Sequence, residues 1–220
     1  ITHLIHERLL AHGVRVRLGE RIVEICGDPV EGVTTEQGGI PCDTVVMAVG
    51  RRPNVDFIDG HQVGLGEMGG VRVDSYLRAG EDVYAAGDCA ETFDFLGRRA
   101  INAVIPTAIE TGRIAALNML GFPTPYAGSI NANVLIVFGR AFFSIGFLDG
   151  DKVQRKAGDK MHLYTLQEGR LVGAQFAGEV IEAAQAVSAI RRGIQAKGIF
   201  RFDALRRQLF LPNVFPNPNR

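Results

Sequence analysis

An acidic residue follows a short apolar segment near the middle of the chain. Val83-Tyr84-Ala85-Ala86 runs into Gly87 and Asp88, which places a carboxylate at the carboxyl end of an expected buried strand, where open α/β sheets bind ligands. A carboxylate accepts hydrogen bonds, so the hydroxyl groups of a ribose or a polyol would be suitable partners. Gly87 has no side chain and would let a ligand approach the backbone. An ordinary turn or helix cap at Asp88 is the alternative.

A helix is expected shortly afterwards, from Pro106 to Leu120 and ended by Gly121. Proline suits the first helical turn, because its missing N–H is not needed there. The N-terminal end of such a helix carries a partial positive charge and free N–H groups. One small and apolar face is expected to be buried, and it comprises Ile105, Ala108, Ile109, Gly112, Ala115, Ala116 and Met119.

Strands and a further helix must position these residues. Residues 1–13 predict a helix closed by Gly13. The continuously apolar residues 44–50 are typical of a parallel strand covered on both faces. The other segments with a strand pattern are residues 14–18, residues 21–40 with breaks at 27–29 and 38–39, and residues 71–74 and 83–86.

The last hundred residues follow a linker at residues 121–125 and have a different pattern. Two strands are expected at residues 134–138 and 141–145. Residues 160–167 and 170–176 predict a hairpin across Glu168-Gly169. A helix at residues 180–193 and a tail rich in proline and asparagine complete the chain.

Taken together, these segments resemble the pyridine-nucleotide flavoprotein reductases of the glutathione-reductase type, and within them the NADH:rubredoxin reductase and nitrite-reductase-like branch. The matching segments are residues 43–54, 70–74, 83–90 and 106–113, with residues 164–178 similar to the small C-terminal domain of that branch. The resemblance implies an α/β fold of incomplete doubly wound FAD/NAD(P)-binding domains, followed by a small α+β C-terminal domain. It implies three parts, residues 1–52 (NAD(P)-binding), 53–125 (FAD-binding) and 126–220.

The resemblance also assigns site residues. Asp88 would bind the ribityl hydroxyls of FAD, with Gly87 allowing the approach. The N-terminus of the helix, at Pro106, Thr107 and Ala108, would aim its backbone N–H groups and its positive dipole end at the N1/O2 edge of the flavin. The remaining two assignments concern NAD(P)H: Gly50 would lie against the nicotinamide, and Arg51 is a plausible polar neighbour of the cofactors. A structural strand end at Gly50 and a surface charge at Arg51 are the alternatives.

By this resemblance the chain is part of an oxidoreductase that passes electrons from NAD(P)H through FAD to an acceptor, either a small redox protein or a disulfide or other small molecule. Both glycine-rich loops of the family are absent, so the chain looks like a C-terminal part that is inactive alone, and no catalytic residue is assigned to it. A dimerisation or redox-partner docking module, including a homodimer, is the alternative function.

Gly64-Leu65-Gly66-Glu67-Met68-Gly69 matches a phosphate-binding pattern, G-x-G-x-x-G. The pattern requires a strand before it and a helix after it, whereas here a strand pattern follows. Glu67 would also place a negative charge facing the negatively charged pyrophosphate. We therefore expect a glycine-rich turn between β segments, with a self-sufficient nucleotide site as a weaker alternative.

Composition excludes several other classes. Lys+Arg and Asp+Glu both number 24, so no overall charge favours nucleic acid, and no apolar run is long enough to span a membrane. Three cysteines, without metal-ligand spacing, suit a reducing cytoplasm, and Cys89 is expected to be a small core residue rather than a redox thiol. No metal site is expected, His3 and His6 included. The basic C-terminal forty residues could steer an acidic electron carrier, or they form a solvated surface.

Overall fold

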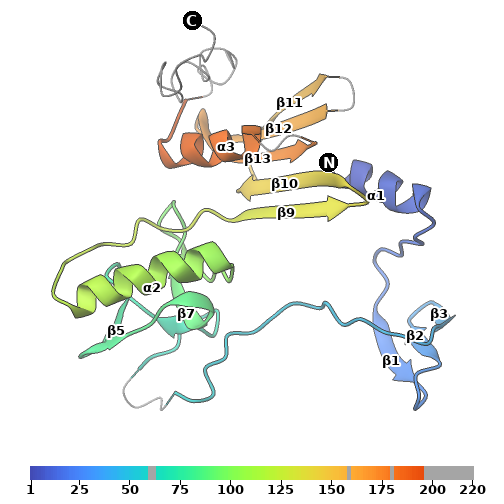
Figure 1. Cartoon of the computed structure of the whole chain (residues 1–220), viewed down its shortest axis with the longest axis horizontal. Helices are drawn as coiled ribbons and strands as arrows, with labels where there is room; N and C mark the ends of the chain where they lie inside the picture. The colour runs from blue at the N-terminus through green and yellow to red at the C-terminus, as the bar shows by residue number, and fades with distance from the viewer. Residues whose placement is uncertain (59–62, 158–159, 179–180, 196–220) are drawn as a thin grey trace, which may run out of the picture. The chain divides into compact units, whose positions relative to one another are not determined.

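The computed structural model describes residues 1–58, 63–157, 160–178 and 181–195 (Figure 1). The chain divides into two compact units, Thr2–Arg52 and Pro53–Arg220. The division into three domains stays a prediction. The basic residues from Lys197 onward and the aromatic tail segment 210–216 lie outside the described residues. In the described ranges, no helix is long and apolar enough to cross a membrane.

The unit Thr2–Arg52 contains one helix and one small sheet. Helix α1 (Thr2–Ala11) ends at Gly13, whose φ is +78° and whose N–H donates to Leu10 O at 3.0 Å, as predicted. None of its ten residues, all of them described, is buried. The antiparallel sheet has the order β1-β2-β3, with strands β1 (Ile22–Cys26), β2 (Gly32–Thr35) and β3 (Gly38–Pro41). This confirms the expected short strands, although residues 38–39 begin β3 rather than break a strand.

Two strand predictions in this unit are wrong. Residues 14–18 and 44–50 are not in strands, and within 44–50 the side chains of Val46 and Val49 are 85% and 80% exposed. A strand needs a neighbouring strand to pair its N–H and C=O groups, and no described residue pairs with either segment. The apolar pattern alone therefore did not produce a strand.

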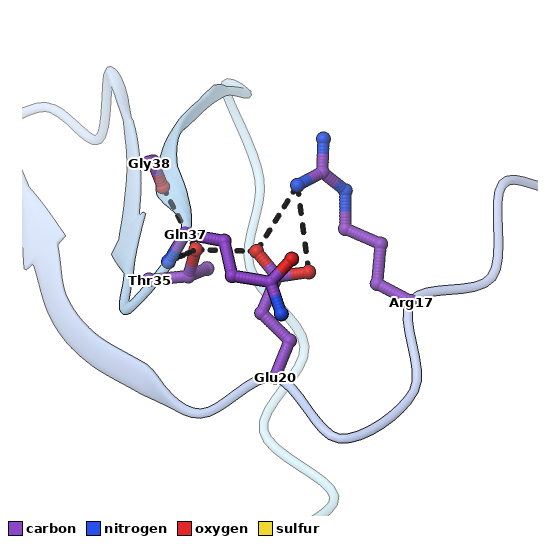
Figure 2. Close-up of polar contacts among 5 residues, drawn as sticks. All are labelled: Arg17, Glu20, Thr35, Gln37 and Gly38. Atoms are coloured by element: carbon purple, nitrogen blue, oxygen red, sulfur yellow. Dashed lines mark hydrogen bonds and ion pairs between the residues drawn. The ribbon is translucent and has the colours of Figure 1, made fainter.

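A polar cluster joins the start of β1 to the turn between β2 and β3 (Figure 2). The Glu20 carboxylate accepts hydrogen bonds from Thr35 Oγ1 at 2.5 Å and from the Arg17 guanidinium at 3.0 Å. Thr35 Oγ1 in turn accepts the Gln37 N–H at 3.2 Å. The hydrogen bond from Thr35 lowers the pKa of Glu20, Arg17 lowers it further, and burial opposes both.

The first part of the unit Pro53–Arg220 consists of short strands and one long helix. Its elements are β4 (Val71–Arg72), β5 (Arg78–Gly80), β6 (Val83–Tyr84), the 3₁₀ turn η1 (Gly87–Cys89), β7 (Ala90–Phe93), β8 (Arg99–Ala100) and α2 (Ile105–Met119). Strand β4 pairs in parallel with β7, which pairs antiparallel with β8. The core here comprises Val71, Val73, Leu77, Ile114, Ala115 and Tyr126.

The strand before Gly87 differs from the prediction. Strand β6 is two half-buried residues long and pairs antiparallel with β5, so it is not a buried strand of a parallel sheet. The parallel pairing comes after the Gly87-Asp88 turn instead, where Ala90 lies opposite Val71. The Gly87-Asp88 turn therefore lies between the short antiparallel pair β5–β6 and the parallel pair β4–β7.

The last part is a five-stranded antiparallel sheet covered by a helix. The strands are β9 (Ala132–Val137), β10 (Arg140–Gly146), β11 (Asp151–Ala157), β12 (Lys160–Gln167) and β13 (Arg170–Ala177), in the order β11-β12-β13-β10-β9. Helix α3 (Ile181–Arg191) packs on β13 and β10. The predicted hairpin is confirmed, with Glu168 and Gly169 both at positive φ as a tight two-residue hairpin turn requires. Strand β11 was missed, because it is largely polar.

Candidate functional site

The turn that carries Asp88 is attached to the first two turns of helix α2. Gly87 has a φ of +73°, a left-handed conformation that favours glycine. Its N–H donates to Thr111 Oγ1 at 3.0 Å. A side-chain carbon built on Gly87 would lie 3.6 Å from Ala108 Cβ, so the turn and the helix are in van der Waals reach. The structure therefore brings together two segments that the sequence separates by twenty residues.

Asp88 is exposed on this turn, one residue from the contact between Gly87 and Ala108. The structure places the Gly87-Asp88 turn against the first two turns of α2, but Asp88 is exposed rather than at the end of a buried strand, and its role toward FAD stays a prediction. Among the described residues, none forms a hydrogen bond or ion pair with its side chain. The carboxylate is therefore available to accept hydrogen bonds from a ligand.

The N-terminal end of α2 is open to an acceptor group. The N-cap residue Val104 has an extended backbone and makes no side-chain hydrogen bond, and proline stands at the start of the helix, as predicted. The first turn contains no acidic side chain. The partial positive charge of the helix is therefore not offset by a side chain of its own first turn. Pro106 is exposed and Thr107 is buried.

Thr111 connects the turn to the helix, and sequence reasoning missed it. Its side chain is 1% exposed. Its Oγ1 accepts the Gly87 N–H and donates to Thr107 O at 2.7 Å. Asn102 Nδ2 donates to Thr107 Oγ1 at 3.2 Å, which fixes the segment before the helix. The available signal was a pair of threonines four residues apart within a helix, where a hydroxyl can bond the carbonyl one turn earlier.

Helix α2 buries a different face from the one expected. Its buried residues are Thr107, Thr111, Ile114 and Ala115. Three members of the predicted apolar face, Ile105, Ile109 and Met119, are 76%, 67% and 66% exposed. The two buried threonines are tolerated because Thr111 has hydrogen-bond partners within the helix and in the Gly87 turn, and Thr107 accepts one from Asn102.

The G-x-G-x-x-G loop is a turn between β segments, as expected. Residues 71–72 after it form strand β4, and Leu65 forms an isolated bridge with Val71. The side chain of Glu91 lies against the loop, where its Oε2 accepts the Met68 N–H at 2.8 Å. The loop therefore faces a carboxylate of this chain, which argues against a phosphate there.

The remaining predicted residues lie elsewhere. Gly50 and Arg51 belong to the unit Thr2–Arg52 and are exposed, and their roles toward NAD(P)H stay predictions. All three cysteines are free. No group of three metal-ligating side chains occurs among the described residues. Of the basic C-terminal residues, Arg191 lies 3.6 Å from Glu110 of α2, which partly neutralises it.

Comparison with known proteins adds to this geometry. Residues 1–112 match the model of one protein family, described as pyridine nucleotide-disulphide oxidoreductase. An NAD(P)H sulfur oxidoreductase (CoA-dependent) of Pyrococcus furiosus is 27% identical over 96% of this chain and 54% of that protein. An NADH oxidase of Streptococcus pneumoniae is 31% identical over 66% of this chain and 32% of that protein.

A solved structure agrees with these matches. The NAD-dependent persulfide reductase from A. fulgidus superimposes with a TM-score of 0.78 and 27% identity, over 88% of this chain and 41% of that one. This likeness confirms the predicted class of a partial, mixed α/β fold. The chain spans about half the length, or less, of the curated relatives it matches.

Proposed function

The chain belongs to the pyridine nucleotide-disulphide oxidoreductase family, and from that premise we propose that it is part of a flavoprotein that passes electrons from NAD(P)H through FAD to an acceptor. The observation that carries this proposal is the Gly87-Asp88 turn, held on the open N-terminal end of α2 by the hydrogen bond from Gly87 to Thr111. The exposed Asp88 follows directly on Gly87, which contacts α2, and a carboxylate and an uncapped helix end suit two neighbouring parts of one ligand.

The residues present fit FAD. Asp88 would accept hydrogen bonds from the ribityl hydroxyls, because a carboxylate offers acceptors and no donor. The N-terminal end of α2, at Pro106, Thr107 and Ala108, would stabilise negative charge at the N1/O2 edge of the flavin. When bound, FAD supplies the redox chemistry. The chain itself supplies the position of the carboxylate, the helix dipole and the rigid link between them through Thr111.

The other parts of the activity are proposed from the relatives. Gly50 and Arg51 would lie near the nicotinamide of NAD(P)H. The relatives include a sulfur oxidoreductase and an NADH oxidase, which supports a small-molecule acceptor, with a small redox protein as the alternative. A cytoplasmic location is supported by the three free cysteines, since oxidising compartments favour disulfides.

Substitution of Asp88 tests the proposal in the full-length protein. We expect purified wild type to be yellow, and Asp88→Ala to raise the FAD dissociation constant about 10- to 100-fold, because hydrogen bonds to a charged group contribute about 1.5–3 kcal/mol. Glu81→Ala is the matched control, since Glu81 is an exposed acid on the turn before β6. A colourless wild type that binds no added FAD, or equal affinity in Asp88→Ala, would contradict the proposal.

A homodimer is proposed from a second observation. Strand β9 is at one edge of the five-stranded sheet, and its Val134, Leu135 and Ile136 are 56%, 51% and 69% exposed. An exposed apolar edge strand favours pairing with another chain. Val134→Lys should lower the mass measured by light scattering from that of a dimer to that of a monomer. A wild-type monomer at micromolar concentration would exclude the dimer.

A further inference from the structure

Glu91 is a buried carboxylate directly after the matching segment 83–90, and the proposed function does not use it. It lies three residues after Asp88, in strand β7, and is 2% exposed. A buried carboxylate is costly unless it accepts hydrogen bonds. Its Oε2 accepts the Met68 N–H at 2.8 Å. A side-chain carbon built on Gly66 would overlap the carboxylate group of Glu91, so glycine is the residue that leaves room for it.

The backbone of the same loop also packs against the backbone of residues 89–91, which directly follow Gly87 and Asp88. A side-chain carbon on Gly70 would lie 3.0 Å from Glu91 N and 3.1 Å from Cys89 O. The parallel pairs Val71–Ala90 and Arg72–Glu91 begin at that point. The glycine-rich loop, residues 64–70, is therefore fixed to residues 89–91 by its backbone and by the Glu91 carboxylate.

Arg99 secures the other side of Glu91. Its guanidinium donates to Val73 O at 2.6 Å and to Glu91 O at 3.1 Å, and it stacks 4.3 Å above the Phe93 ring. Residue 91 is thus held by its side chain on the loop and by its carbonyl on Arg99. The preceding turn has one fixed end at this residue and the other at the Gly87–Thr111 hydrogen bond.

We propose that Glu91 is a positioning residue for FAD. Its carboxylate occupies the place in the glycine-rich loop that a phosphate would take, and it thereby fixes the position of Asp88 relative to the start of α2. The inference rests on the proposed function, because it assigns Asp88 to the ribityl chain. It gives the G-x-G-x-x-G loop a role without nucleotide binding: its second glycine, Gly66, makes space for an internal carboxylate.

A double-mutant cycle between Gly66 and Glu91 tests this proposal in the full-length protein. We expect Gly66→Ala to raise the FAD dissociation constant about tenfold or more, the loss of one charged-group hydrogen bond being of that order. In the double variant Gly66→Ala/Glu91→Ala, the added side-chain carbon at position 66 no longer overlaps a carboxylate. The FAD dissociation constant of this double variant should therefore equal that of Glu91→Ala, and the increases from the two single substitutions should not multiply. Gly64→Ala is the matched control, since a side-chain carbon there has no neighbour within 4 Å.

Conservative variants separate positioning from stability. Glu91→Gln keeps an oxygen acceptor for Met68 and should bind FAD within about threefold of wild type, whereas the shorter Glu91→Asp should weaken binding and shift the reduction potential of the bound flavin. Thr92→Val removes the hydrogen bond from the neighbouring Thr92 to Ala100 O. It should lower the melting temperature and leave the potential unchanged.

The outcomes distinguish the two proposals. Wild type that binds no FAD would defeat the proposed function itself. Wild type that binds FAD, with Glu91→Asp and Gly66→Ala equal to it in affinity and potential, would overturn the role of Glu91 alone. A potential that shifts equally in Thr92→Val would also overturn it, because the effect would then follow stability rather than position.

Discussion

The sheet β9–β13 and the unit Thr2–Arg52 both contain short apolar segments, but only the sheet builds a large buried core, although Val134, Leu135 and Ile136 of its edge strand β9 are exposed. Its core combines Phe176, Ala174 and Ile145, each 2% exposed or less, with the covering helix α3. In Thr2–Arg52, helix α1 buries no residue, and residues 44–50 extend without a paired strand. The sheet has its pairing partners and its cover within one continuous segment of sequence. An apolar pattern therefore becomes a strand where a partner strand is present to pair its N–H and C=O groups.

The largest expected effect is in the sheet. Phe176→Ala should destabilise it by about 3–5 kcal/mol, because it leaves a cavity in a fully buried site. Hydrogen exchange of the β12 and β13 amides, followed by mass spectrometry, measures the loss. Phe122→Ala is the control, since that ring is 61% exposed, and it should change stability by less than about 0.5 kcal/mol. Equal effects of both would contradict the buried core.

The next effect tests whether the Gly87-Asp88 turn resembles the sheet in depending on buried contacts. Thr111→Val removes the acceptor of the Gly87 N–H and should cost about 1–3 kcal/mol. Thermal unfolding and the exchange rate of the Gly87 amide measure it. Thr124→Val, at an exposed hydrogen bond to Phe122 O, is the control. Unchanged exchange at Gly87 would show that this bond does not hold the turn.

A smaller, pH-dependent effect is expected in Thr2–Arg52, where polar contacts replace a large core. The pKa of Glu20 is lowered in the folded unit, first by Thr35. The stabilisation is therefore present above the pKa of an unfolded glutamate, about 4.3, and is lost as pH falls through the lower folded value. Glu20→Gln should destabilise the unit at pH 7 and make no difference at the acid end. A difference from wild type that does not change with pH would contradict this assignment.

The smallest effect is expected at the exposed segment. Val46→Ser should change the free energy of unfolding by less than about 0.5 kcal/mol, because Val46 is 85% exposed. Urea denaturation of the 220-residue chain measures it. A loss above about 1 kcal/mol would show that residues 44–50 are buried, and the contrast with the sheet would disappear.

Local chemistry explains which predictions succeeded. Proline at 106 and glycine at 121 marked the ends of α2 to within a residue or two. The tight turn at Glu168-Gly169 set the adjacent pairs, Gln167–Arg170 and Leu166–Leu171, before the register shifts at Thr165. Strand β11 was not predicted because it is largely polar and charged, and no alternation of apolar and polar residues is visible in it. The buried face of α2 was not predicted because Thr107 and Thr111, rather than Ile105 and Ile109, are buried beside Ile114 and Ala115. The hydrogen bond from Gly87, far along the chain, makes the burial of Thr111 tolerable.

By itself the sequence determined the family segments, the Gly87-Asp88 pair, the ends of the helix and the rejection of a phosphate loop at residues 64–69, because each depends on neighbours along the chain. Only the tertiary structure decided that Gly87 lies on Ala108 and Thr111, and that Glu91 fills the glycine-rich loop. Those contacts join residues more than twenty positions apart. Hydrogen bonds and overlap depend on distances in space, which no local pattern encodes.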